Sequence, residues 1–263
     1  MPTNFRLITI PVSHYVEKVR WGLDYLKIPF RESPQMPPFH RGAVQKYSVT
    51  TVPVLVADSL AEPLCAGRRF ANRMRIVKTD STEILRYLDT LAPGKLYPPD
   101  PELQELSSEL ETLFNLTLGV STRQWGYSHV LTRELLYPRW TFGVPFWQKL
   151  LFPLIFPKIE PIIRENYQIT PTSAAKSYQE IIGVFDRVTE VLSDGRKYLL
   201  GDRFSAIDIT FAALAVPILQ PAEQYTPFTS IDLLPAQMQA DIRNCRSTPA
   251  GEFGLRLYRE NRR

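Results

Sequence analysis

Hydrophobic residues near the start of the chain follow a strand pattern, then a helix pattern, then a strand pattern again. Residues 5–10 form a short β-rich run that Pro11 ends. From Ser13, apolar residues recur at helical spacing and charged residues fill the other face, which places a helix N-terminus at or just before Ser13. The charged residues are Glu17, Lys18, Arg20, Asp24 and Lys27. Residues 28–32 fit a second strand, and a β-α-β unit of this size predicts parallel strands.

Two more strands and a second helix follow a proline-rich connection over residues 35–50. Residues 52–56 predict a strand, and residues 75–78 are a plausible antiparallel partner for it. Asp80 and Glu83 have the spacing of a capping box, with Asp80 as N-cap, ahead of an apolar helical pattern. This part of the chain therefore predicts an α/β domain.

A proline inside the third apolar run marks a candidate binding element. Pro53 has no N–H to give to a sheet, yet it follows Thr51-Val52 in a strand-like segment. A cis bond at Pro53 would leave the backbone N–H and C=O of Val52 pointing outward. Such an edge can pair with an extended peptide, so we interpret Val52 as a peptide clamp.

The second half of the chain has helical periodicity throughout. Ser205 and Asp208 have the spacing of a capping box, and Phe204 and Ile209 that of the flanking hydrophobic staple. An apolar helix face precedes them, made by Tyr178, Ile181, Ile182, Phe185, Val188 and Leu192. Frequent prolines between residues 138 and 161 predict interrupted helices in that region.

Composition adds constraints on environment and partners. The 263 residues carry a net charge of +4, too weak to indicate nucleic-acid binding without a clustered basic face. The two cysteines, Cys65 and Cys245, have no metal or disulfide spacing, so we expect no metal and a reducing cytoplasm. No run of 18 apolar residues and no leader sequence is visible, which predicts a soluble protein without a transmembrane segment.

Several motifs, in order, resemble the cytosolic glutathione transferase superfamily. Residues 13–20 (SHYVEKVR) resemble its Ser-Pro-Phe-x-x-x-Val-Arg segment, 51–55 (TVPVL) its Val-Pro-x-Leu, and 80–85 (DSTEIL) its Glu-Ser-x-x-Ile-Leu. Residues 198–208 (YLLGDRFSAID) are similar to the signature of its second domain, and 248–251 (TPAG) to bacterial members. The resemblance implies a thioredoxin-like domain over 1–91, a linker over 92–101 and an all-helical domain over 102–263.

The resemblance also implies a site. Ser13 would donate a hydrogen bond to the sulfur of glutathione and favour its thiolate, although a helix cap alone is the simpler role of such a serine. Val52 and Pro53 would hold the cysteinyl part, and Asp80 and Ser81 the γ-glutamyl end. Asp80 is one methylene shorter than the family's usual Glu.

Other residues near these motifs leave alternatives open. His14 departs from the family's Pro, and it or Tyr15 could tune the thiolate. Residues 60–73 exceed a family hairpin and predict a solvated loop. An arginine cluster there could instead bind a carboxylate of glutathione, an anionic substrate or an acidic partner; its members are Arg68, Arg69, Arg73 and Arg75.

The most apolar stretch, residues 142–157, is rich in aromatic rings. We interpret most of it as core. By resemblance it could also wall the electrophile pocket, and a dimer face or a membrane-touching surface are further options.

The sequence therefore predicts a glutathione transferase, active as a cytoplasmic homodimer in detoxification, that conjugates or reduces an apolar electrophile with glutathione as cosubstrate. The competing class is a non-catalytic protein of the same fold that binds an apolar ligand or a protein partner, because a fold does not settle function.

Overall fold

A mixed four-stranded sheet organises the first third of the chain in this computed structural model, which describes residues 3–60 and 73–262. The strand order is β2-β1-β3-β4. β1 pairs parallel with β2 and antiparallel with β3, and β4 pairs antiparallel with β3. The strands are β1 (Thr3–Thr9), β2 (Phe30–Pro34), β3 (Val54–Leu60) and β4 (Arg73–Lys78). The predicted strands and their directions are confirmed.

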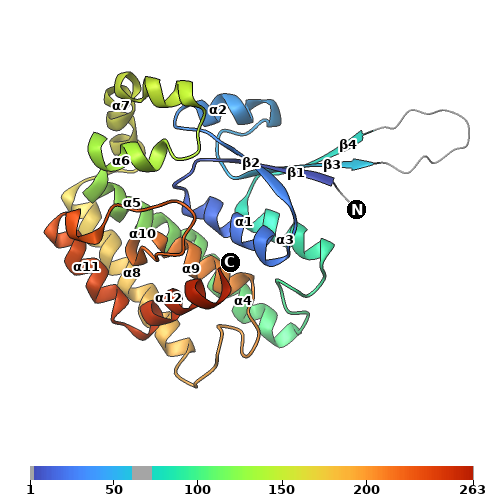
Figure 1. The fold of residues 1–263 in the computed structure, drawn as a ribbon. Coiled ribbons are helices and arrows are strands. Elements are labelled where there is room, and N and C mark those ends of the chain that lie inside the picture. The colour runs from blue at the N-terminus through green and yellow to red at the C-terminus, as the bar shows by residue number, and fades with distance from the viewer. Residues whose placement is uncertain (1–2, 61–72, 263) are drawn as a thin grey trace, which may run out of the picture.

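Helices cover both faces of this sheet (Figure 1). Leu7 and Leu55 pack into the main core with α1 (His14–Tyr25) and α3 (Ser81–Leu91). Ile8 and its neighbours on the other face form a second cluster with α2 (Phe39–Val44) and the following 3₁₀ turn η1 (Gln45–Tyr47). Alternation of side chains along each strand produces these two layers. A thioredoxin-like α/β domain results.

The charged face of α1 is buried, which its periodicity does not predict. Glu17, Lys18 and Arg20 are all buried, because α1 packs against both α3 and α9 (Ala206–Leu214) instead of facing water. Lys18 Nζ donates to Thr82 Oγ1 at 2.8 Å, and burial lowers the pKa of Lys18 to about 8. Polar partners thus replace solvent along this helix.

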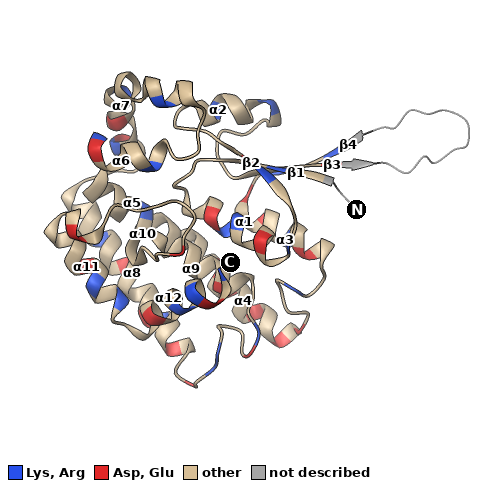
Figure 2. Ribbon diagram, viewed as in Figure 1, with Lys and Arg blue, Asp and Glu red and all other residues tan. Residues whose placement is uncertain are grey.

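The remainder of the described chain is mostly helical and lies beside the sheet domain (Figure 1). Its helices are α4 (Pro101–Leu113), the π-helical turn η2 (Phe114–Leu118), α5 (Gly119–Val130), α6 (Arg133–Trp140), α7 (Phe146–Asn166), α8 (Pro171–Val191), α9, α10 (Val216–Leu219), the 3₁₀ turn η3 (Ile231–Leu233), α11 (Ala236–Arg246) and α12 (Pro249–Asn261). None of the described helices is long and apolar enough to cross a bilayer. In the view of Figure 2, acidic and basic positions are interspersed over these helices.

The prediction that prolines interrupt the helices between residues 138 and 161 is wrong for α7, a continuous 21-residue helix. Pro153, Pro157 and Pro161 recur every four residues along one side of it, and Pro157 and Pro161 are exposed. Each proline removes one helical hydrogen bond, but water can satisfy a carbonyl released on the exposed side. Phe152 and Phe156, which directly precede two of these prolines, anchor the adjacent side of the helix in the core.

The capping box predicted at Ser205 is confirmed at the start of α9. Asp208 Oδ2 accepts hydrogen bonds from Ser205 N at 2.8 Å and Ser205 Oγ at 2.7 Å. Asp208 Oδ1 accepts from Leu199 N at 2.9 Å, so the carboxylate also fixes the preceding turn. In α8, Ile181, Phe185 and Val188 are buried as predicted. The other members of that face, Tyr178, Ile182 and Leu192, are only partly buried.

Candidate functional site

A cavity lies between the edge of the sheet domain and the helical region. Its volume is about 170 Å³, and it opens to solvent. The sheet domain contributes Ser13, His40 and Val52, and the helical region contributes Arg123 and Arg139 among others. The lining combines apolar side chains with a few polar groups, as the linings of small-molecule sites do.

Ser13 is the N-cap of α1, as predicted, and it lies on the cavity wall. Its Oγ accepts a long hydrogen bond of 3.4 Å from Val16 N. Within the described residues, its hydroxyl proton is donated to no protein group. Cap and hydroxyl donor are therefore compatible roles for this one side chain.

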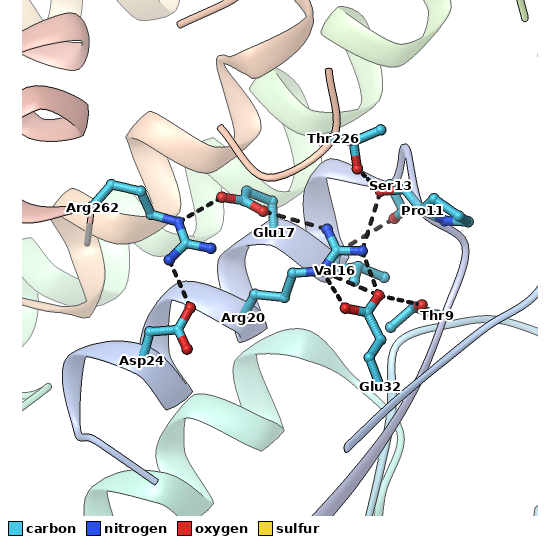
Figure 3. A network of polar contacts seen from close by, with 10 residues as sticks. All are labelled: Thr9, Pro11, Ser13, Val16, Glu17, Arg20, Asp24, Glu32, Thr226 and Arg262. Atoms are coloured by element: carbon cyan, nitrogen blue, oxygen red, sulfur yellow. Dashed lines mark hydrogen bonds and ion pairs between the residues drawn. The ribbon is translucent and has the colours of Figure 1, made fainter. Parts of the chain in front are cut away.

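A buried ionic network holds the turn that precedes Ser13 (Figure 3). Arg20 Nη2 donates to the carbonyl of Pro11 at 3.2 Å, and Thr226 Oγ1 donates to the same oxygen at 2.6 Å. Arg20 also forms a double contact with Glu32, from Nη2 at 2.6 Å and from Nε at 3.1 Å. This arrangement ties β2, α1 and the loop around Thr226 to the start of the site.

The same network reaches the end of α12 (Figure 3). Glu17 accepts from Arg20 Nη1 at 3.3 Å and from Arg262 Nε at 2.8 Å. Arg262 Nη1 also donates to Asp24 at 2.7 Å. The C-terminal helix is thus fastened to α1, the helix that carries Ser13.

Val52 and Pro53 are joined by a cis peptide bond, as the sequence predicts. Val52 and Thr51 line the same cavity as Ser13, at the start of β3. The structure therefore brings the predicted clamp and the predicted hydroxyl to one wall. Pro53 itself is not among the lining residues.

Asp80 and Ser81 stand at the start of α3, outside the lining of the cavity. Asp80 Oδ1 accepts hydrogen bonds from Thr82 N at 2.8 Å and Glu83 N at 3.0 Å. Asp80 is the N-cap as predicted, but Glu83 turns its carboxylate to Lys78 Nζ and Thr79 N. Burial raises the pKa of Tyr15, and the charge of Asp80 adds to this rise, so Asp80 acts on the start of α1.

His14 and Tyr15 are both engaged in structural contacts. His14 Nε2 lies 2.9 Å from the carbonyl oxygen of Gly119, and burial lowers the pKa of His14 to about 3, so its ring is neutral. Tyr15 Oη donates to Asn115 O at 2.8 Å. A Cβ at Gly119 would collide with the Tyr15 hydroxyl, so the close approach of α5 requires glycine. These residues join the two parts of the chain.

Two further points concern metal binding and the predicted arginine cluster. Within residues 3–60 and 73–262, no group of three or more metal-ligating side chains is found. The arginine cluster of residues 60–73 depends on Arg68 and Arg69, which lie outside the described residues.

Comparisons with known proteins identify the fold. Residues 7–96 match the family model for the N-terminal domain of glutathione S-transferase. Similar solved structures include a glutathione S-transferase of Ceriporiopsis subvermispora in complex with glutathione, at 17% identity and a TM-score of 0.57 over 98% of both chains. Residues 7–96 thus resemble the N-terminal domain of glutathione S-transferases, and the whole chain has the fold of the solved glutathione S-transferases.

Two further structures show the same likeness over nearly the whole length. A glutathione transferase from Phanerochaete chrysosporium is 13% identical, with a TM-score of 0.60 over 98% of this chain and 97% of that chain. A theta class enzyme from Xanthomonas axonopodis pv. citri, with glutathione bound, is 17% identical, with a TM-score of 0.53 over 97% and 98%. No curated protein sequence matches. At these identities the structural likeness establishes the fold.

The most apolar stretch of the chain does not line the cavity. The interpretation of residues 142–157 as mostly core is wrong, because Phe146, Trp147, Leu150 and Leu154 are exposed along α7. Val144, Phe152 and Phe156 are buried. The apolar part of the cavity wall comes instead from the helical region and from Ile10, Val12 and Val52 of the sheet domain. In the helical region it comes from α5, α6, α10, α11 and the loop before η3.

Sequence reasoning missed the two arginines of the cavity. Arg123 lies on α5 and Arg139 on α6, and neither stands in a motif of the glutathione transferase superfamily that we recognised. A usable signal was present: each is an isolated cation in an aromatic-rich segment, close to Trp125 and Trp140 respectively. Their burial depends on packing between distant helices, which local periodicity does not reveal.

Proposed function

We propose that the protein is a glutathione transferase that conjugates or reduces an apolar electrophile with glutathione activated by Ser13. One observation carries the proposal: the Ser13 hydroxyl caps α1 on the wall of the cavity and keeps its proton available there. The match of residues 7–96 to the N-terminal domain of glutathione S-transferase supports glutathione as the cosubstrate.

The chemistry follows from the position of the hydroxyl. A hydrogen bond from Ser13 to the glutathione sulfur favours the thiolate over the thiol. The N-terminus of α1 adds about half a positive charge in the same direction. Arg123, on the same cavity wall, adds a full charge. The thiolate is the nucleophile that attacks the electrophile.

The remaining contacts to glutathione would come from the segment around Val52 and from the start of α3. The backbone of Val52, held by Pro53, would pair with the cysteinyl part. Ser81 and the free N–H groups at the start of α3 would bind the γ-glutamyl carboxylate, and Asp80 the ammonium. In this proposal residues 1–91 hold glutathione, 92–101 connect, and 102–263 hold the electrophile.

Ser13→Ala tests the proposal directly. Loss of one hydrogen bond to a charged sulfur costs about 1.5–3 kcal/mol, so kcat/KM should fall about 10- to 150-fold. The assay uses 1-chloro-2,4-dinitrobenzene with saturating glutathione. Ultraviolet absorbance of the bound thiolate against pH should show the thiol pKa raised.

Ser13→Gly separates the two roles of this residue. Glycine costs only a few tenths of a kcal/mol at an N-cap, whereas alanine costs about 1 kcal/mol. Both variants lack the hydroxyl, so both should lose the same rate while their stabilities differ. If kcat/KM fell in proportion to the loss of stability in each variant, Ser13 would have no part in the mechanism. An unchanged kcat/KM in both variants would lead to the same conclusion.

Ser81→Ala should weaken glutathione binding about tenfold with little change in stability, because Asp80, not Ser81, caps α3. Isothermal titration calorimetry measures the affinity. Thr90→Ala, at the exposed end of the same helix, controls for the change in helix propensity. Parent affinity in Ser81→Ala would place the γ-glutamyl end elsewhere.

We further propose a cytoplasmic homodimer with a role in detoxification. The free thiol of Cys245 supports a reducing location, where cysteines stay unpaired. Glutathione binding without turnover of any electrophile would favour the competing class, a non-catalytic binding protein.

A further inference from the structure

The cavity wall carries two guanidinium groups and, among its described lining residues, no carboxylate. Arg123 Nε and Arg139 Nε are both buried without a hydrogen-bond partner. Within the described chain neither residue forms a hydrogen bond or an ion pair. Their contacts are with rings: Arg123 lies 4.5 Å from the centroid of Tyr167, and Arg139 lies 4.0 Å from that of Phe228.

Arg20, another buried arginine, has carboxylate partners. It is buried like Arg139 but contacts Glu17 and Glu32, so its charge is compensated. Arginine is rarely buried unless it is paired, because desolvation of the cation is costly. Arg139 is only 6% exposed and lacks such a partner. Burial lowers the pKa of Arg139 to about 10, which still leaves it charged at neutral pH.

Both cations act on one region of the cavity. Tyr127 lies on the wall, where burial raises its pKa and the charges of Arg123 and Arg139 both oppose that rise. The surrounding wall is apolar, made by Val12, Val130, Leu136, Pro217, Phe228 and Met238. A ligand that matches this wall has an apolar body and one anionic group.

We infer that the acceptor substrate is an apolar organic acid, an aromatic carboxylate, whose carboxylate binds Arg139 with support from Arg123. The inference deepens the proposed function and rests on it for the transfer step. Binding of the acid does not require transfer. An anion at this position supplies the partner that neither arginine finds in the described protein.

A pair of probes tests this acceptor class: 4-chloro-3-nitrobenzoate and the neutral 4-chloro-3-nitrobenzamide. In each, the glutathione thiol loses its proton to solvent, the C–S bond forms, the C–Cl bond breaks, and chloride leaves with the bonding electrons. Each enzymatic kcat/KM is divided by the uncatalysed rate constant with glutathione, which removes the difference in intrinsic reactivity. The carboxylate should be favoured about tenfold or more.

A second pair separates binding from transfer: naphthalene-2-carboxylate and naphthalene-2-carboxamide, which carry no leaving group. Calorimetry with and without glutathione gives their affinities. The carboxylate should bind about tenfold more tightly in both conditions. If this preference is found but no probe is turned over, the inference on the cavity stands and the proposed transferase function fails.

Arg139→Met tests the named residue, since methionine keeps an unbranched apolar side chain without the charge. In both pairs of probes, the ratio of the value for the carboxylate to the value for the amide should fall about tenfold. Arg133→Met, on the exposed first turn of the same helix, should retain the parent preference. Thermal denaturation verifies that each variant is folded.

Two outcomes overturn the inference. Equal affinity of the parent protein for naphthalene-2-carboxylate and its amide would show that the cavity does not select an anion. An equal loss of glutathione affinity and of carboxylate affinity in Arg139→Met would show that the arginine holds glutathione itself. The first outcome does not depend on any variant, so the test remains decisive if Arg139→Met fails to fold.

Discussion

Arg20→Met should lower the free energy of unfolding by about 3–5 kcal/mol, because it leaves buried carboxylates without their cation. Glu17 would keep only Arg262, and Glu32 would keep only the hydroxyl of Thr9, which donates to it at 2.6 Å. The carbonyl of Pro11 would lose one of its two donors (Figure 3). Urea denaturation monitored by tryptophan fluorescence measures the change.

Arg31→Met is the matched control for this variant. Arg31 neighbours Glu32 on β2 but is exposed, so its replacement should change stability by less than about 0.5 kcal/mol. If Arg20→Met were as stable as Arg31→Met, the buried network would contribute no net stability. The turn before Ser13 would then be held by Thr226 and by packing alone.

Local signals explain why the sheet domain could be predicted from the sequence. Ser13 and Asp80 act as caps through hydrogen bonds to residues two or three positions away, so the spacing of the sequence is sufficient to identify them. Pro53 likewise reports on its own peptide bond. Each of these residues carries its signal within one helical turn or one strand.

The burial of charge could not be predicted in the same way. Glu17 and Arg20 have the periodicity of a solvated helix face, and only the approach of α9 and of Arg262, more than 240 positions away, buries them. The exposed aromatic residues of α7 show the opposite case. Trp147 looks like core by composition but is exposed, because tertiary packing decides which side of an apolar helix is covered.

In the candidate site too, some residues could be predicted from local motifs and others could not. Ser13 and Val52 come from motifs, whereas the shape and charge of the cavity come from α5 and α6, whose helical periodicity is weak. Arg139 enters the cavity because α6 packs so that Phe228, from a loop nearly ninety positions later, covers its guanidinium. The part of the site that we propose to select the acceptor is therefore the part that depends on long-range packing.

Asp208→Ala should lower the free energy of unfolding by about 3–5 kcal/mol, more than an ordinary cap. Its carboxylate accepts hydrogen bonds from Leu199 N and Ser205 N, and both N–H groups would become buried and unsatisfied. Burial raises the pKa of Asp208 to about 6, so denaturation at pH 7.5 compares the ionised form. Asp100→Ala, which removes the exposed cap of α4, should cost only about 1 kcal/mol. Equal losses in the two variants would reduce Asp208 to a simple cap and refute its role in fixing the turn at Leu199.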